Sequence, residues 1–294
     1  MEISHEKVVS FFKNSFSYNY HQPLYSMTLK LWDLYINIES PSLVSIQTLR
    51  KHYINFIDST ADSKPDAVIR FVREKDFLNF PVSTDYQKYT QMDRSLLVAP
   101  FFVIHFVAQS NYIEMVVEEG YDIYLLSAMR AIAPFLAFKR GGILLHASGV
   151  CYGDRLYAFV GHSGAGKSTI VKLLTNCEES IEVLTDEAVM LEVNADQCVG
   201  WGTPYGREHS GVNLSVPLGC CFFLVQDKGT YLKPLTSGQA VTELMANLWC
   251  TYSSDKLVEN ALDIVVKISE IIPCYELHFE LNDYFWKEIR QLSN

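Results

Sequence analysis

The sequence lacks the features that mark exported, membrane-spanning or nucleic-acid-binding proteins. Its first residues, MEISHEKVVSFFKNSF, are interrupted by charges and do not combine a basic start with an apolar stretch, so no signal peptide is expected. Residues 96–108 are apolar but too short to span a bilayer as a helix, and they predict a buried strand. Residues 123–138 carry Arg130 and Pro134, which favours a kinked helix facing the core. We therefore expect no membrane partner.

Positive charge is scarce and cysteine patterns are absent. The net charge is -10, from 34 acidic and 24 basic residues, and no basic run occurs, which argues against a nucleic-acid partner. The seven cysteines form no C-x-x-C pair and no Cys/His metal spacing. An odd number of cysteines without an export signal favours free thiols in a reducing compartment, so we expect a cytoplasmic protein.

The composition favours a packed globular protein with two parts. Hydrophobic residues make up 49% and aromatic residues 13% of the 294 residues, enough for a substantial core. Residues 1–118 predict a small α/β N-terminal domain without a motif that indicates chemistry, whose role is packing or substrate docking. We expect its helices at 6–16 and 42–56, with strands at 31–38, 67–73, 96–108 and 112–118.

Residues 119–294 alternate strands with helices, which predicts an α/β sheet. The expected helices are 123–139, 237–249, 255–271 and 282–292, and the expected strands are 143–150, 156–160, 182–185, 189–193, 220–225 and 275–281. Gly153-Asp154 predicts a turn that pairs the first two of these strands as a hairpin.

The strand at 156–160 runs directly into a glycine-rich loop that is followed by a helical pattern, the context of a phosphate-binding loop. Glycines let consecutive backbone N–H groups point at phosphate oxygens, and the helix start adds its positive dipole end. Lys167 is expected to reach the β- and γ-phosphates of ATP, and the Ser168 hydroxyl to complete a Mg²⁺ shell. The alternative is a loop of the same shape that binds no nucleotide. The motif comprises Gly161, His162, Ser163, Gly164, Ala165, Gly166, Lys167, Ser168 and Thr169.

Further candidates for chemistry lie on both sides of this loop. Asp186 and Glu187 end an apolar strand, where a carboxylate can hold Mg²⁺ or accept a proton from an attacking hydroxyl, although solvated acids in a turn are common. Adjacent strand residues face opposite ways, so we expect one acid, Asp186, in the site. His146 is either a core histidine or a site residue. Residues 200–209 contain Arg, Glu and His among glycines and form either a lid or an ordinary connection.

Two other nucleotide-related patterns are not supported. Residues 235–239, Leu-Thr-Ser-Gly-Gln, are close to the signature loop of transporter ATPases, but the residues after them predict a helix rather than a strand ending in Asp-Glu. Helix capping by Ser237 is the better explanation. The guanine-reading motif Asn-Lys-x-Asp is absent, which removes the usual support for a GTPase.

Taken together, a Leu-His-Ala-Ser strand, a hairpin, the G-x-S-G-x-G-K-S-T loop and a strand ending in Asp186 resemble the HPr kinase/phosphorylase C-terminal domain. They are most similar to the HPr-kinase-related proteins, some of which occur in lasso-peptide biosynthesis clusters. The resemblance covers about residue 123 to the end. It implies a P-loop kinase domain of the phosphoenolpyruvate carboxykinase/HPr kinase type and transfer of the γ-phosphoryl group of ATP to a serine hydroxyl.

The same resemblance implies roles for individual residues. Lys167 and Ser168 would hold phosphates and magnesium, Asp186 would take the serine proton, His146 would support the acceptor site, and Glu208 would be a further metal or substrate contact. The family's Asp in the loop is His162 here, and its Glu-x-Arg-Gly-Leu-Gly-Ile segment is absent, so HPr and the phosphorylase reaction are not expected.

The sequence therefore predicts an ATP- and Mg²⁺-dependent kinase acting on a hydroxyl of a peptide, protein or small molecule. An ATPase and a non-catalytic nucleotide-sensing module are the alternatives. Family members assemble into rings, so a homo-oligomer is a further alternative that no sequence feature indicates.

Overall fold

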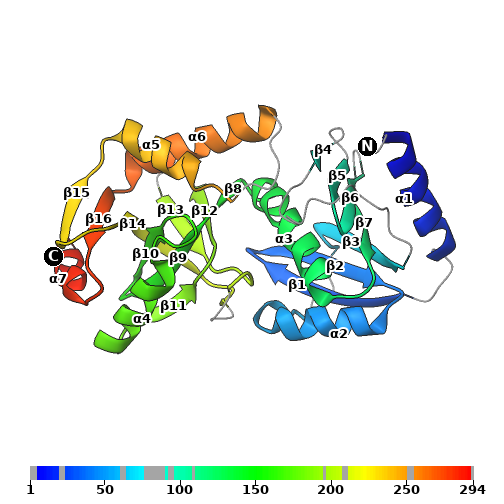
Figure 1. Ribbon diagram of the computed structural model, residues 1–294, viewed down its shortest axis with the longest axis horizontal. Coiled ribbons are helices and arrows are strands. Elements are labelled where there is room, and N and C mark those ends of the chain that lie inside the picture. Colours follow the sequence, from blue (N-terminus) through cyan, green and yellow to red (C-terminus); the bar gives the residue numbers. More distant parts are fainter. Residues whose placement is uncertain are drawn as a thin grey trace. The chain divides into compact units, whose positions relative to one another are not determined.

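The computed structural model describes residues 5–19, 24–59, 64–75, 90–91, 96–107, 110–194, 197–206, 211–249 and 255–292 (Figure 1). The structure is mixed α/β and divides into two compact units, Met1–Ala133 with Thr251–Ser254, and Pro134–Cys250 with Asp255–Asn294. The division falls inside helix α3 (Asp122–Lys139), later than the boundary expected after residue 118. In the described part of the chain, no helix is both long enough and apolar enough to cross a membrane.

The first unit is built on a seven-stranded sheet in the order β1-β2-β3-β7-β6-β5-β4. Helix α1 contacts β3 and β7, and helix α2, capped by the Ser42 side chain, contacts β1 and β2. The elements are α1 (His5–Asn19), β1 (Tyr25–Leu31), β2 (Leu34–Ser40), α2 (Leu43–His52), the 3-10 helix η1 (Ile54–Phe56), β3 (Ala67–Glu74), β4 (Thr90–Gln91), β5 (Leu96–Ala99), β6 (Phe102–Phe106) and β7 (Tyr112–Glu118).

Two expected strands in this unit are wrong because each is a hairpin. The expected strand 31–38 is interrupted by Trp32 and Asp33, whose φ angles of 53° and 64° reverse the chain between β1 and β2. The expected strand 96–108 turns after Ala99, so that Leu96 pairs with His105 across β5 and β6. The expected helix 42–56 ends at His52 and continues as η1.

The second unit is built on a nine-stranded sheet with the order β11-β9-β10-β14-β13-β12-β8, in which β16 pairs with β14 and β15 (Figure 1). Its elements after α3 are β8 (Gly142–Leu145), β9 (Ala147–Tyr152), β10 (Arg155–Val160), α4 (Lys167–Cys177), β11 (Glu182–Thr185), β12 (Val189–Asn194), β13 (Gln197–Trp201), β14 (Ser215–Gln226), β15 (Tyr231–Pro234), α5 (Ser237–Ala246), α6 (Asp255–Ile271), β16 (Cys274–Phe279) and α7 (Tyr284–Gln291).

The expected hairpin before the loop is confirmed, since β9 and β10 pair antiparallel from Arg155 opposite Tyr152 to Val160 opposite Ala147. The expected strand 143–150 is wrong in one respect, because it breaks at His146. Its first part, β8, pairs with β12, and its second part, β9, pairs with β10 and β11. His146 therefore lies between two consecutive strands that pair with different neighbours in the sheet.

Other elements of the second unit also differ from expectation, among them β14, which begins at Ser215 rather than at residue 220, and α5, which ends at Ala246 rather than at residue 249. Strand β13 covers part of the segment expected to be a glycine-rich loop, and β15 was not expected. Helix α5 is capped by Thr236 rather than Ser237, in a capping box with Gln239. The Thr236 side chain accepts a hydrogen bond from the Gln239 N–H, and the Gln239 side chain accepts one from the Thr236 N–H. Segment 235–239 therefore contains the N-terminal cap of helix α5.

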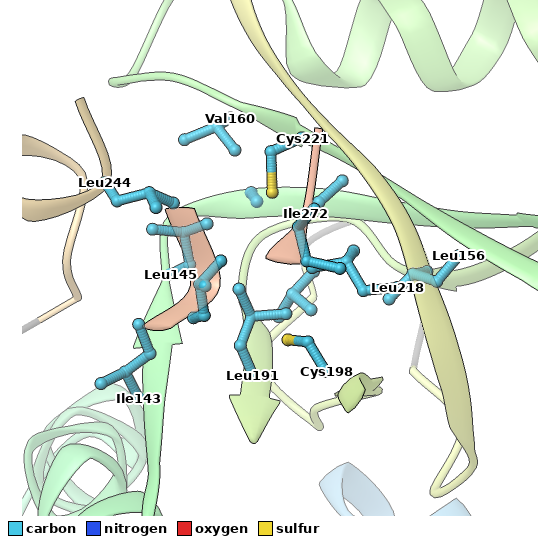
Figure 2. Close-up of a cluster of buried hydrophobic side chains, with 14 of the residues drawn as sticks. Ile143, Leu145, Leu156, Val160, Leu191, Cys198, Leu218, Cys221, Leu244 and Ile272 are labelled. Carbon is cyan, nitrogen blue, oxygen red and sulfur yellow. The ribbon is translucent and has the colours of Figure 1, made fainter. Parts of the chain in front are cut away.

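The core of the second unit lies on both faces of the sheet. Along β10, Leu156, Ala158 and Val160 belong to one buried cluster, whereas Tyr157 and Phe159 belong to the other. Helices α5 and α6 contribute side chains to the first cluster, and α4 and α7 to the second. Figure 2 shows the first cluster, in which Leu156 and Val160 lie among apolar side chains of neighbouring strands. Strand β10 is therefore buried on both faces, and it ends where the glycine loop begins.

Candidate functional site

The glycine-rich loop lies between β10 and α4, as the sequence predicts. Its backbone needs glycine, because Gly164 has φ 86° and Gly166 has φ 108°. An added Cβ on Gly166 would stand 2.8 Å from Cζ of Phe279, and one on Gly161 would stand 2.7 Å from Cβ of Ala165. The loop therefore makes a tight turn over the end of the sheet with its middle residues exposed.

Lys167, the first residue of α4, folds back under this loop. Its side chain is buried (6% exposed), and Nζ donates to the carbonyl oxygens of Gly161 at 2.6 Å and His162 at 3.1 Å. These carbonyls offset the cost of burying the ammonium group. Because α4 starts at the same point, the lysine charge and the positive end of the helix dipole coincide beside the loop.

The next residues continue the first turn of α4 without capping it. Gly166 is the N-cap, and because it has no side chain it makes no side-chain cap hydrogen bond to the first turn of the helix. Ser168 is exposed and Thr169 is partly buried. Two contacts fix the loop itself, from the Ala165 N–H to the His162 carbonyl at 3.1 Å and between His162 Nδ1 and the Ser163 carbonyl at 2.8 Å. The start of α4 therefore has no side-chain cap from its N-cap residue.

A residue that the sequence did not indicate also holds the loop. Gln226, at the end of β14, donates from Nε2 to the Gly164 carbonyl at 3.1 Å. Strand β14 lies beside β10, so its end reaches the loop although the two residues are 62 positions apart. No local pattern marks Gln226, because only the sheet order brings it to the loop.

His146 lies at the base of the loop. Its carbonyl accepts a hydrogen bond from the Gly161 N–H at 3.3 Å, and its own N–H donates to the Asn247 carbonyl at 2.9 Å. Its Nε2 lies 3.4 Å from Oε1 of Glu187. The structure therefore brings together two expected site features, His146 and the first residue of the loop, and adds Glu187 as a partner for the imidazole.

Asp186 and Glu187 lie in the bend after β11 rather than on the strand, which ends at Thr185. The two side chains consequently need not point to opposite faces, as adjacent residues on a strand would. Asp186 is buried (3% exposed) and its carbonyl accepts from the Ser148 hydroxyl at 2.9 Å. Glu187 is the acid that contacts His146.

The sheet topology places these residues at one edge. Strand β9 is antiparallel to both β10 and β11, so the ends of β10 and β11 and the start of β9 share that edge. The loop follows β10, the two acids follow β11, and His146 precedes β9. The loop with its buried lysine, a histidine and two carboxylates therefore lie at the same edge of the sheet.

The segment after β13 supports this edge from one side. The Thr203 hydroxyl donates to the Ala188 carbonyl at 2.8 Å, and the ring of Tyr205 lies 5.7 Å from that of Trp249, centroid to centroid. Trp249 also lies 6.1 Å from the ring of His146. Glu208, expected as a metal or substrate contact, lies with Arg207 and His209 outside the described residues.

Two of the residues expected to hold magnesium, Ser168 and Asp186, lie in the described part of the chain. Ser168 and Asp186 supply hard oxygen donors, which suit Mg²⁺, an ion that usually keeps several waters and few protein ligands. Among the described residues, no group of three or more His, Cys, Asp or Glu side chains is arranged to hold a metal. A resident metal centre is therefore not indicated by this part of the chain.

Comparison with known proteins adds little to this geometry. No protein-family model matches the chain, and no curated protein sequence matches it. Among solved structures, the chain is similar to the Hpr(Ser) kinase/phosphatase from Coxiella burnetii, with 11% identity and a TM-score of 0.32 over 50% of this chain and 94% of that chain. A structural similarity with so low a TM-score carries no argument about function.

Proposed function

We propose that this protein is an ATP- and Mg²⁺-dependent kinase that transfers the γ-phosphoryl group to a hydroxyl, with serine as the expected acceptor. The observation that carries the proposal is the buried Lys167, held beneath the glycine loop by the Gly161 and His162 carbonyls at the start of α4. A buried ammonium group beside an uncapped helix start is suited to binding the phosphate chain of a nucleotide.

Phosphoryl transfer requires mainly positioning and charge stabilisation from the protein. The loop N–H groups and Lys167 would stabilise the negative charge that spreads over the γ-phosphoryl oxygens. Magnesium, held by Ser168, would supply further positive charge to the β- and γ-phosphates.

Other residues at the same edge of the sheet would act on the hydroxyl group that accepts the phosphoryl group. The hydroxyl oxygen of the acceptor forms a bond to the γ-phosphorus, the bond between that phosphorus and the β–γ bridging oxygen breaks, and ADP leaves. The hydroxyl proton goes to Asp186. The pair of Glu187 and His146, 3.4 Å apart, fixes the imidazole beside the loop and so supports the acceptor. The acceptor is the hydroxyl of a peptide, a protein or a small molecule.

The proposal is tested by following the label from γ-labelled ATP in the presence of magnesium with free serine, serine-ended peptides and a cell extract. Label on serine or a peptide supports the kinase and names the acceptor class. Label that appears only as free phosphate identifies an ATPase, and label that stays on bound ATP identifies a nucleotide sensor. Lys167→Met is the control, because transfer that persists in this variant would exclude the loop as the nucleotide site.

A further inference from the structure

The same unit also has a pocket at the other end of β10 from the glycine loop. This pocket of about 500 Å³ opens between the β9–β10 hairpin, the first half of β14, the start of β16 and the end of α7. This volume falls within the range of small-molecule sites. The pocket is lined by Tyr152, Gly153, Asp154, Arg155, Tyr157, Gly219, Cys220, Pro273, Tyr275 and Leu292.

The pocket exists because β14 changes neighbours at this point. Strand β14 pairs with β13 as far as Pro217 and with β16 from Cys221 onward. Between these positions Gly219 is an extra residue in the ladder with β10, since Leu156 pairs with Leu218 and Tyr157 pairs with Cys220. A bulge of this kind opens a sheet locally, and such bulges are frequent next to binding sites.

The polar groups that line the pocket are mainly hydrogen-bond donors. Within the described residues, the Tyr152 and Tyr275 hydroxyls and the Arg155 Nη atoms have no hydrogen-bond partner. The single ion pair of Arg155 joins Nε to Asp154 at 3.9 Å, and the Asp154 side chain is 95% exposed. Burial raises the pKa of the Tyr275 hydroxyl, which therefore keeps its proton at neutral pH.

Other residues that line the pocket are buried. Tyr157 and Cys220 are among them, and the Cys220 thiol donates to the Pro273 carbonyl at 3.1 Å. The rings of Tyr152 and Tyr157 pack edge-on against Trp286, at centroid distances of 4.9 and 6.2 Å, which holds them in place. Fixed aromatic rings prefer a planar partner.

We infer that this pocket binds a small planar anion, an aromatic carboxylate. The aromatic ring would lie against the tyrosine rings, and the carboxylate would accept hydrogen bonds from the guanidinium fork of Arg155 and the two tyrosine hydroxyls. The site is separate from the glycine loop, because Arg155 begins β10 and the loop follows its last residue, Val160. The inference is independent of phosphoryl transfer, since the ligand needs no phosphate.

The test is an NMR titration of the ¹⁵N-labelled protein with benzoate at constant ionic strength. Benzoate is expected to shift the amide signals of Gly153 and Gly219 but not that of Gly164 in the glycine loop, with a dissociation constant of about 1 mM for so small a fragment. Cyclohexanecarboxylate tests the planar ring and benzamide tests the charge, and both are expected to bind at least about fivefold more weakly.

Variants separate specific binding from general association. Arg155→Gln should weaken benzoate binding about tenfold, since a hydrogen-bonded charge pair is lost, and Tyr275→Phe should weaken it about threefold. Lys267→Gln, an equal change of charge at an exposed position of α6, should leave binding unchanged. Equal affinity for the three probes, unchanged binding in Arg155→Gln, or shifts at Gly164 in place of Gly219 would each overturn the inference.

Discussion

Gln226 offers a sharp test of the loop geometry, because it touches the loop without belonging to the motif. Its Nε2 donates to the Gly164 carbonyl at 3.1 Å from the end of β14. Replacing Gln226 with Ala removes this bond and leaves every group that would face the phosphates in place. The loop should then be less well fixed, and part of the nucleotide affinity should be lost.

The size of the effect follows from the type of bond. A neutral hydrogen bond contributes about 0.5–1.5 kcal/mol net, and the exposure of Gln226 places it in the lower half of that range. A loss of about 0.5–1 kcal/mol corresponds to a two- to fivefold rise, roughly, in the dissociation constant of Mg²⁺-ATP. Gln226→Glu should weaken binding further, because a carboxylate would face the Gly164 carbonyl and the phosphates.

Isothermal titration calorimetry with a non-hydrolysable ATP analogue and magnesium measures this change directly. Gln197→Ala is the matched control, since Gln197 is exposed at the start of β13, a strand that does not pair with β10 or lead into the loop. Affinity in Gln226→Ala equal to that of the wild type, or Gln226→Glu binding as tightly as Gln226→Ala, would refute the claim that this side chain fixes the loop.

Three further predictions concern single residues. Gly166→Ala should lower the free energy of unfolding by about 1–3 kcal/mol in urea, because φ is 108° and the added methyl meets an aromatic ring, whereas Gly238→Ala, in open space, should not. Asp186→Asn should keep Mg²⁺-ATP binding and lose transfer by about 100-fold or more; loss of binding instead would make it a metal ligand. The hydrogen bond from Lys233 lowers the pKa of Glu276, so the stability this carboxylate provides is present above its unfolded pKa and lost as pH falls through the lower folded value. The difference in unfolding free energy between wild type and Glu276→Gln should therefore shrink below about pH 4, and a constant difference would contradict it.

The parts of the structure set by neighbouring residues could be predicted from the sequence. The apolar run 156–160, the glycines that follow and the helical pattern from Lys167 lie within a short segment, and the structure has them as β10, a loop and α4. The hairpin before β10 was also predictable, because Gly153-Asp154 marks a turn between two apolar runs.

The parts set by distant contacts could not be predicted in this way. The link between Gln226 and Gly164 depends on β14 lying beside β10, and the contact of His146 with Glu187 depends on a break in a continuous apolar run. The turn at Trp32 and Asp33 carries no glycine or asparagine. Asp33 tolerates a positive φ angle and is a weak turn signal, but Trp32 gives none, so the sequence did not mark the turn clearly.

Binding of Mg²⁺-ATP to the wild type and to Lys167→Met tests the central claim most directly. The wild type should bind, and the variant should bind at least about tenfold more weakly, because a charge-assisted hydrogen bond to phosphate contributes about 1.5–3 kcal/mol. Circular dichroism and urea unfolding would show that the variant remains folded. Equal affinity in the two proteins, or no binding by the wild type, would contradict the assignment of the glycine loop as a nucleotide site.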